Sequence, residues 1–269
     1  MKGELAMRIG AQLYTVREYT QTLRDFADTI KKIAAIGYEC VQISAVSPEI
    51  PPQEIAETCK AHNLEIIITH TKPARILDET EVVIEEHKMM GAKYVGIGMI
   101  PDSYSTNKEG FRRFITDFIP AARAIKEADL QLMYHNHHIE FERFDGVLLI
   151  DYMKDKFHDV SFTLDTFWVQ AGGADPALWI ENLAERVDVI HLKDYAVVDG
   201  KRRMAEVMEG NLNWPAIMKA AAKAGVKYGM VEQDDCYEND PFECLRHSLH
   251  KLKEGFPEFF TEKKGDSEQ

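Results

Sequence analysis

The sequence has few cysteines, and none stands in a pattern that would make it structural. Cys40, Cys59, Cys236 and Cys244 are the four in a chain of 269 residues, and no two of them have Cys-x-x-Cys spacing. This excludes a disulfide framework and a zinc ribbon. Four unpaired thiols fit a reducing compartment, so we expect a cytoplasmic protein.

Long apolar runs are also missing. No stretch of 18 consecutive apolar residues is present, so a membrane-spanning helix is not expected. The first residues, MKGELAMRIG, lack the apolar core that a signal peptide requires. We expect residues 1–7 to be a poorly ordered extension and the polar residues 258–269 to be a frayed tail.

Basic charge is scarce relative to acidic charge. The chain has 32 Lys and Arg against 45 Asp and Glu, which gives a net charge of −13. An acidic surface repels phosphate backbones, so we expect no nucleic-acid partner. We therefore expect the partner to be a small molecule.

Short β-rich runs alternate with longer helical patterns along the whole chain. The predicted strands are residues 8–13, 41–43, 65–70, 94–98, 130–135, 160–164, 187–192 and 227–232. The predicted helices are residues 23–36, 52–62, 79–90, 108–128 with an interruption at Pro120, 147–156, 176–185, 214–224 and 241–253. Eight βα units in about 250 residues are typical of a (β/α)8 TIM barrel. We predict one such α/β domain over residues 8–257.

An open doubly-wound sheet is the competing architecture. That fold usually carries a Gly-x-Gly-x-x-Gly turn after its first strand. Here the first strand runs into Gln12-Leu13-Tyr14-Thr15, which contains no glycine. The sequence therefore favours the closed barrel.

Polar side chains stand at the end of several predicted strands, where a barrel places its active site. Gln12 closely follows the first strand, and His70 ends the third. Asp165, His191 and Glu232 end the sixth, seventh and eighth. A carboxylate at the end of an apolar strand is paired or holds a metal if it points inward, although Asp165 alone could equally be a helix cap.

A histidine-rich segment, His135-Asn136-His137-His138, follows the fifth strand and leads to Glu140. His135 and His137 share one face of an extended chain. Either is a candidate ligand or substrate contact, and either could take the place of Glu140, which lies several residues beyond the strand. Oxygen ligands with imidazole suit Mn²⁺, and Zn²⁺ is an alternative.

Five motifs resemble the sugar phosphate isomerase/epimerase family, whose members have a xylose isomerase-like TIM barrel. They are GAQLYTVR, YHNHHIEF, LDTFW followed by AGGADP, HLKD, and VEQDD. The resemblance implies one divalent metal, most readily Mn²⁺ but also Zn²⁺, Co²⁺ or Mg²⁺, held by Glu140, Asp165, His191 and Glu232. It also implies that Glu140 and Glu232 act as an acid/base pair. Trp168 stands where related epimerases often have histidine.

These residues predict a metal-dependent isomerase or epimerase of a sugar or keto-sugar derivative. A carboxylate would abstract a proton next to a metal-bound carbonyl. Lys193 and His70 would donate to the developing oxyanion, Trp168 would form an apolar wall, and Gln12 and His137 would bind substrate. A lyase or dehydratase that acts on inososes or 3-keto-glycosides shares the first step and remains an alternative.

Two further functions fit the sequence less well. A DNA-repair endonuclease of the related barrel family needs three zinc ions and a basic face, which the charge of −13 disfavours. A sugar-binding barrel without activity is the other possibility. Barrels of this kind often pair, so a homo-oligomer is open, although no predicted helix shows a clear apolar outer stripe.

Overall fold

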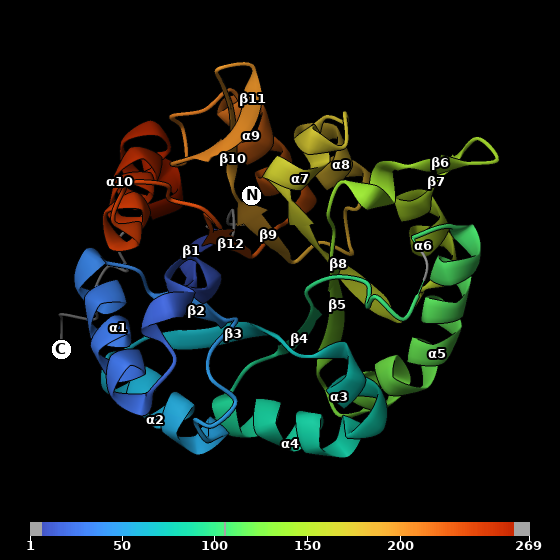
Figure 1. Cartoon of the computed structure of the whole chain (residues 1–269), viewed down its shortest axis with the longest axis horizontal. Helices are drawn as coiled ribbons and strands as arrows, with labels where there is room; N and C mark the ends of the chain where they lie inside the picture. The colour runs from blue at the N-terminus through green and yellow to red at the C-terminus, as the bar shows by residue number, and fades with distance from the viewer. Residues whose placement is uncertain (1–6, 105, 261–269) are drawn as a thin grey trace, which may run out of the picture.

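Eight parallel strands close into a barrel in the computed structural model, which describes residues 7–104 and 106–260. Figure 1 looks into the ring of strands with the helices arranged around it. The barrel strands are β1 (Arg8–Gln12), β2 (Cys40–Ile43), β3 (Glu65–His70), β4 (Tyr94–Ile97), β5 (Gln131–His135), β8 (Val160–Asp165), β9 (Val189–Leu192) and β12 (Tyr228–Val231). Each strand pairs with its neighbours in chain order, and β1 pairs with β12 to close the ring. The predicted fold class is confirmed.

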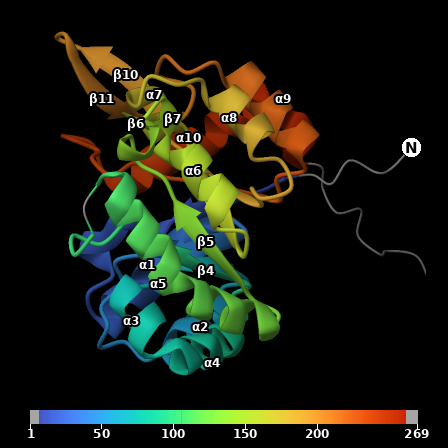
Figure 2. The same ribbon diagram turned by 90° about the vertical axis from the view of Figure 1, so that its right-hand side faces the viewer.

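The helices pack outside the strands or follow their carboxyl ends (Figures 1 and 2). They are α1 (Leu23–Ile36), α2 (Pro52–Ala61), α3 (Pro73–Asp78), α4 (Thr80–Met90), α5 (Lys108–Glu127), α6 (Leu149–Lys156), α7 (Thr166–Ala171), α8 (Pro176–Asn182), α9 (Trp214–Ala224) and α10 (Pro241–Gly255), with the 3-10 helices η1 (Leu13–Tyr19), η2 (Ile139–Phe141) and η3 (Pro257–Phe260). Side chains of Thr22, Asn107 and Asp240 cap α1, α5 and α10. Such caps satisfy amide groups that a helix start leaves free.

The expected interruption at Pro120 is wrong, because α5 runs through it without a break. Proline removes the hydrogen bond to the carbonyl four residues earlier. Pro120 lies on the exposed face of α5, so water can reach that carbonyl, and the apolar opposite face holds the helix against the barrel.

Besides the 3-10 helices, four structural units were absent from the sequence prediction. Two are the short helices α3 and α7, and two are hairpins, β6 (Arg143–Phe144) with β7 (Val147–Leu148) and β10 (Asp194–Val198) with β11 (Lys201–Ala205). Residues 147–148 were predicted as helix and are strand. All four follow barrel strands on the side where the site lies, and Figure 2 shows the β10–β11 hairpin projecting there.

The structure describes only a few residues of the predicted N-terminal extension and C-terminal tail. Met7 is buried in the hydrophobic core, and Pro257–Phe260 form η3. The rest of the predicted extension and tail, residues 1–6 and 261–269, lies outside the described residues. No helix in residues 7–104 and 106–260 combines the length and the apolar character that crossing a membrane would need.

The interior of the barrel is filled in layers that follow the two-residue alternation of the strands. Met133, Val189 and Met230 belong to a cluster that packs inside the ring. The residues between them, such as Tyr134 and Ile190, face outward into the larger core under the helices. Two positions after these three apolar residues stand His135, His191 and Glu232, so the next inward side chain on each of these strands is polar.

Asp194 anchors the β10–β11 hairpin and the loop that follows it. Its carboxylate accepts hydrogen bonds from the backbone N–H of Tyr195, Met208 and Gly210 at 2.7, 2.8 and 3.0 Å. The indole N–H of Trp214 donates to it at 2.6 Å. Asp194 is fully buried. If its carboxylate were removed, water could not reach these donors, and they would be left without an acceptor.

We predict that Asp194→Ala lowers the free energy of unfolding by about 3 kcal/mol or more, because each buried donor left unpaired costs about 1–3 kcal/mol. Urea denaturation followed by circular dichroism measures the change. Asp28→Ala, at an exposed position of α1, is the control and should stay within about 0.5 kcal/mol of wild type. Equal stability of the two variants would show that Asp194 is not an anchor.

Candidate metal and substrate site

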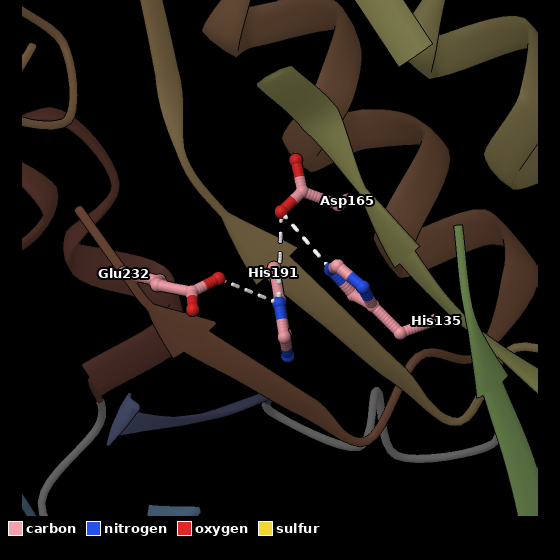
Figure 3. Close-up of side chains that lie close together, drawn as sticks. All are labelled: His135, Asp165, His191 and Glu232. Atoms are coloured by element: carbon pink, nitrogen blue, oxygen red, sulfur yellow. Dashed lines mark hydrogen bonds and ion pairs between the residues drawn. The ribbon is translucent and has the colours of Figure 1, made fainter. Parts of the chain in front are cut away.

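Four buried side chains converge at the carboxyl end of the barrel: His135, Asp165, His191 and Glu232 (Figure 3). Each offers one nitrogen or oxygen atom, and these atoms all lie within 4.8 Å of one another. They come from β5, β8, β9 and the residue after β12, four strands that neighbour one another in the ring. Among the described residues, this is the single group of three or more such side chains.

The distances inside the group are short. His191 Nδ1 lies 2.8 Å from Glu232 Oε2 and 3.6 Å from Asp165 Oδ2. His135 Nε2 lies 3.3 Å from the same Asp165 oxygen. Asp165 uses its other oxygen, Oδ1, to accept from the backbone N–H of Trp168 at 2.9 Å. The helix-cap and ligand interpretations of Asp165 are therefore compatible, since each takes a different oxygen.

The outer nitrogens of both imidazoles are held by acceptors. His135 Nδ1 lies 2.9 Å from the carbonyl oxygen of Gly98, and His191 Nε2 lies 2.8 Å from Gln42 Oε1. An acceptor at the outer nitrogen places the ring proton there and turns the lone pair of the inner nitrogen into the site. This is the arrangement of metal-binding histidines.

The buried polar atoms also fit a cation. Among the described residues, His191 Nδ1 and Glu232 Oε2 have no well-aligned hydrogen-bond partner, which is costly for buried groups unless a further group satisfies them. Two imidazoles with two carboxylates form a donor set that suits Mn²⁺, Zn²⁺ or Co²⁺. The residues present are therefore able to hold one divalent metal ion.

Lys193 lies beside the carboxylates, with only 1% of its surface exposed. Its ammonium is 3.2 Å from Asp165 Oδ2, 3.0 Å from Glu232 Oε2 and 2.8 Å from Asp234 Oδ1. Burial alone would lower the pKa of Lys193, but the three carboxylates together outweigh burial and raise it. The lysine therefore stays charged.

The pKa values of the two carboxylates of the group are lowered, whereas that of Lys193 is raised. Burial would raise the pKa of Glu232, but Lys193 and His191 lower it well below its usual value. Burial would likewise raise the pKa of Asp165, but Lys193 and the two histidines outweigh burial and lower it. Both remain ionised in the buried site.

Glu140 is not brought together with the other three predicted ligands. It is fully buried, and its carboxylate accepts from the Tyr134 hydroxyl at 2.5 Å and from the His137 backbone N–H at 2.7 Å. Burial raises the pKa of Glu140 to about 7, although these hydrogen bonds oppose the shift. His135, which the sequence left open as a rival ligand, is in the group instead.

A cavity of about 450 Å³ opens in front of the group and is called the main cavity below. Every substrate contact predicted from the sequence lines it: Gln12, His70, His137, Trp168 and Lys193. Among the described residues, His70 Nε2, His137 Nδ1 and Trp168 Nε1 are buried without a hydrogen-bond partner. Three unpaired polar atoms around one cavity are what a polyhydroxyl ligand would satisfy.

Gln12 and Trp168 have additional roles. The Gln12 amide donates to Glu232 Oε1 at 2.6 Å and accepts from the Tyr14 N–H at 2.5 Å, which fixes the orientation of Glu232. The Trp168 ring stacks on His138, and its centroid is 5.6 Å from Lys193 Nζ. Trp168 thus forms an aromatic wall beside the charged group.

Gln42 and Asp234 were not singled out from the sequence as site residues. Gln42 binds His191, and its signal is a buried amide in the middle of the apolar strand Cys-Val-Gln-Ile. Asp234 pairs with Lys193, and its signal is the acidic run that follows Glu232. Both signals come from polar residues at inward or strand-end positions.

The chain is similar to known proteins over most of its length. The family model described as xylose isomerase-like TIM barrel matches residues 30–254. No curated protein matches. A sugar phosphate isomerase/epimerase from Parabacteroides distasonis has a similar structure, with a TM-score of 0.77 and 21% identity, over 94% of this chain and 96% of that one.

Two other similar structures differ in their reactions. An L-ribulose 3-epimerase has a TM-score of 0.70 and 15% identity, over 96% of this chain and 99% of that one. A probable 3-DHS dehydratase involved in petrobactin synthesis, from Bacillus anthracis, has a TM-score of 0.70 and 11% identity, over 92% and 99%. At these identities the likeness shows a common fold.

We predict that Lys193→Met lowers the free energy of unfolding of metal-free protein by about 3–5 kcal/mol, because it leaves buried carboxylates uncompensated. Chemical denaturation in the presence of a chelator measures the loss. Lys227→Met is the matched control, since Lys227 pairs with Asp188 at 2.9 Å but is 42% exposed. The control should lose about 1 kcal/mol or less, and a similar loss in both variants would contradict the prediction.

Proposed function

The chain belongs to the xylose isomerase-like TIM barrel family, and on that premise we propose that it is a divalent-metal-dependent isomerase or epimerase of a sugar or keto-sugar derivative. The observation that supports this most directly is the buried group His135, Asp165, His191 and Glu232, of which His135 and Glu232 line a cavity that also has unpaired polar atoms. A bound ion supplies a Lewis acid that polarises a carbonyl group.

Within this proposal, Glu232 moves the proton. It lines the main cavity, remains ionised, and is oriented by Gln12. It takes a proton from the carbon next to the substrate carbonyl. In isomerisation a proton returns to the former carbonyl carbon while the hydroxyl proton moves to the former carbonyl oxygen, and in epimerisation a proton returns to the opposite face of the same carbon. Glu140, which does not line the cavity, is a positioning residue that fixes the backbone of His137.

Lys193 supplies the matching positive charge. Its ammonium contacts three carboxylates and lines the cavity, so it exchanges one of these contacts for a hydrogen bond to the oxygen that becomes negative as the proton leaves. His70 and His137 present their unpaired nitrogens to substrate hydroxyls, and Trp168 packs against the carbon face of the sugar.

The assignment of the fourth ligand gives a direct test. We predict that His135→Ala weakens Mn²⁺ binding by more than about 100-fold, since even the outer partners of metal ligands are worth about 10–100-fold. Glu140→Gln should bind Mn²⁺ much like wild type, because both of its carboxylate oxygens already accept hydrogen bonds. Titration followed by electron paramagnetic resonance measures both affinities.

The reverse order of affinities would assign the fourth position to Glu140. Circular dichroism of both variants excludes a loss caused by unfolding.

The proton-transfer role is tested with Glu232→Gln in Mn²⁺-supplemented assays on a set of ketoses and keto-sugars. We predict a fall in the rate of about 10²–10⁴, the usual contribution of a positioned base. Glu238→Gln, at an exposed position outside the cavity, is the control and should retain wild-type activity. Wild-type turnover by Glu232→Gln would overturn the assignment.

The same assay in deuterated water separates isomerase from lyase. An isomerase or epimerase conserves all heavy atoms and incorporates one deuterium, whereas a lyase releases water or another leaving group. Mass spectrometry of the products distinguishes the two. Release of a leaving group would replace the proposed reaction with elimination from the same site.

A further inference from the structure

A second cavity, of about 430 Å³, adjoins the main cavity. It lies between the loop that follows β2 and the loop that follows β3, above α2 and α4. Ser44 and Ala45 from the first loop, and His70 to Lys72 from the second, line both cavities. We propose that this second cavity binds an aromatic or other apolar substituent of the carbohydrate substrate. The proposal rests on the proposed function.

The connection between the cavities lies where the two loops meet. Ser44 Oγ and His70 Nδ1 are 3.2 Å apart and bridge the loops. Residues next to this bridge line both cavities, so a substituent on a sugar in the main cavity would pass beside the bridge to enter the second one. Only a ligand with two parts fills both spaces.

The second cavity has a cluster of apolar side chains that the main cavity lacks. Ile43, Val46, Ile50, Ile55 and Met90 line it and do not line the main cavity. A dry cavity of about 150 Å³ is enough for a benzene ring, so the available volume accommodates an aromatic group with substituents.

The polar groups that line the second cavity and not the main one are already hydrogen-bonded. His87 Nε2 lies 2.8 Å from Thr69 Oγ1, and His87 Nδ1 lies 2.7 Å from the carbonyl oxygen of Val83. Thr69 also bonds Thr71, and Arg75 forms two hydrogen bonds with Glu86. The main cavity, in contrast, has unpaired ring nitrogens on His137 and Trp168, which do not line the second cavity. A sugar therefore fits the main cavity, and a group without hydroxyls fits the second.

The wall between the cavities is held in a strained form. Ala45 has φ of +55°, a left-handed conformation that costs a residue other than glycine about 1 kcal/mol or more. Its carbonyl accepts from the Gln21 amide at 2.9 Å, which helps to hold that conformation. Such strain is concentrated at ligand-binding sites.

Two methionines report separately on the two cavities. Met90 lines the second cavity and Met99 lines the main one. In Zn²⁺-loaded protein with ¹³C-labelled methionine methyl groups, phenol should shift the Met90 resonance and methyl β-glucoside the Met99 resonance. Phenyl β-glucoside should shift both.

Each contrary outcome has a defined meaning. An unshifted Met90 resonance with phenol overturns the apolar site. If phenol shifts the Met90 resonance but phenyl β-glucoside does not, the second cavity does not bind a substituent of the substrate. If neither glucoside shifts Met99 while phenol shifts Met90, the carbohydrate site of the proposed function fails and the apolar site stands.

Calorimetric titration with the same glucosides tests variants in which a larger side chain fills the second cavity. Wild type should bind phenyl β-glucoside about tenfold more tightly than methyl β-glucoside, a difference of about 1.4 kcal/mol. Met90→Trp should remove this preference and leave methyl β-glucoside binding unchanged. Met89→Trp is the control, because Met89 is on the same helix but is 51% exposed. Val46→Phe replaces Met90→Trp if that variant does not fold, and a preference that survives filling overturns the proposal.

Discussion

Two buried carboxylates, Asp165 and Glu232, face one another at the carboxyl end of the barrel, and the surrounding structure compensates their charge. Burial of an ionised carboxylate is unfavourable unless it is paired or bound to a metal. Lys193 supplies a buried cation at 3.2 and 3.0 Å from the two groups, and the histidines offer further contacts. The fold thus concentrates negative charge at one point and surrounds it with groups that stabilise it.

The backbone around Lys193 is built to keep that cation in place. The Thr166 hydroxyl lies 2.7 Å from the Lys193 carbonyl oxygen and 3.1 Å from its backbone nitrogen, which ties the start of α7 to the end of β9. The next residue, Asp194, is fixed by donors from the following loop and from Trp214. The charged side chain therefore sits between two anchored segments.

Most of the barrel and three of the four site residues could be predicted from the sequence, because both depend on local periodicity. Asp165, His191 and Glu232 follow apolar strands at inward positions, and strand alternation fixes where they point. The choice between His135 and Glu140 could not be made in this way, because Glu140 lies in the short helix η2, whose direction depends on contacts with Tyr134 and His137. The helices α3 and α7 were missed because six residues carry too little periodicity to recognise.

The β10–β11 hairpin turns at Asp199 and Gly200, both exposed and both left-handed, with φ of +50° and +72°. Its base is anchored at Asp194, and among the described residues no side chain of the buried group His135, Asp165, His191 and Glu232 bonds to the tip. Natural variation can therefore lengthen, shorten or replace the tip without disturbing the charged centre. The hairpin is therefore a variable element beside a fixed charged centre, and a change in its length alters the surface around the site and not the centre itself.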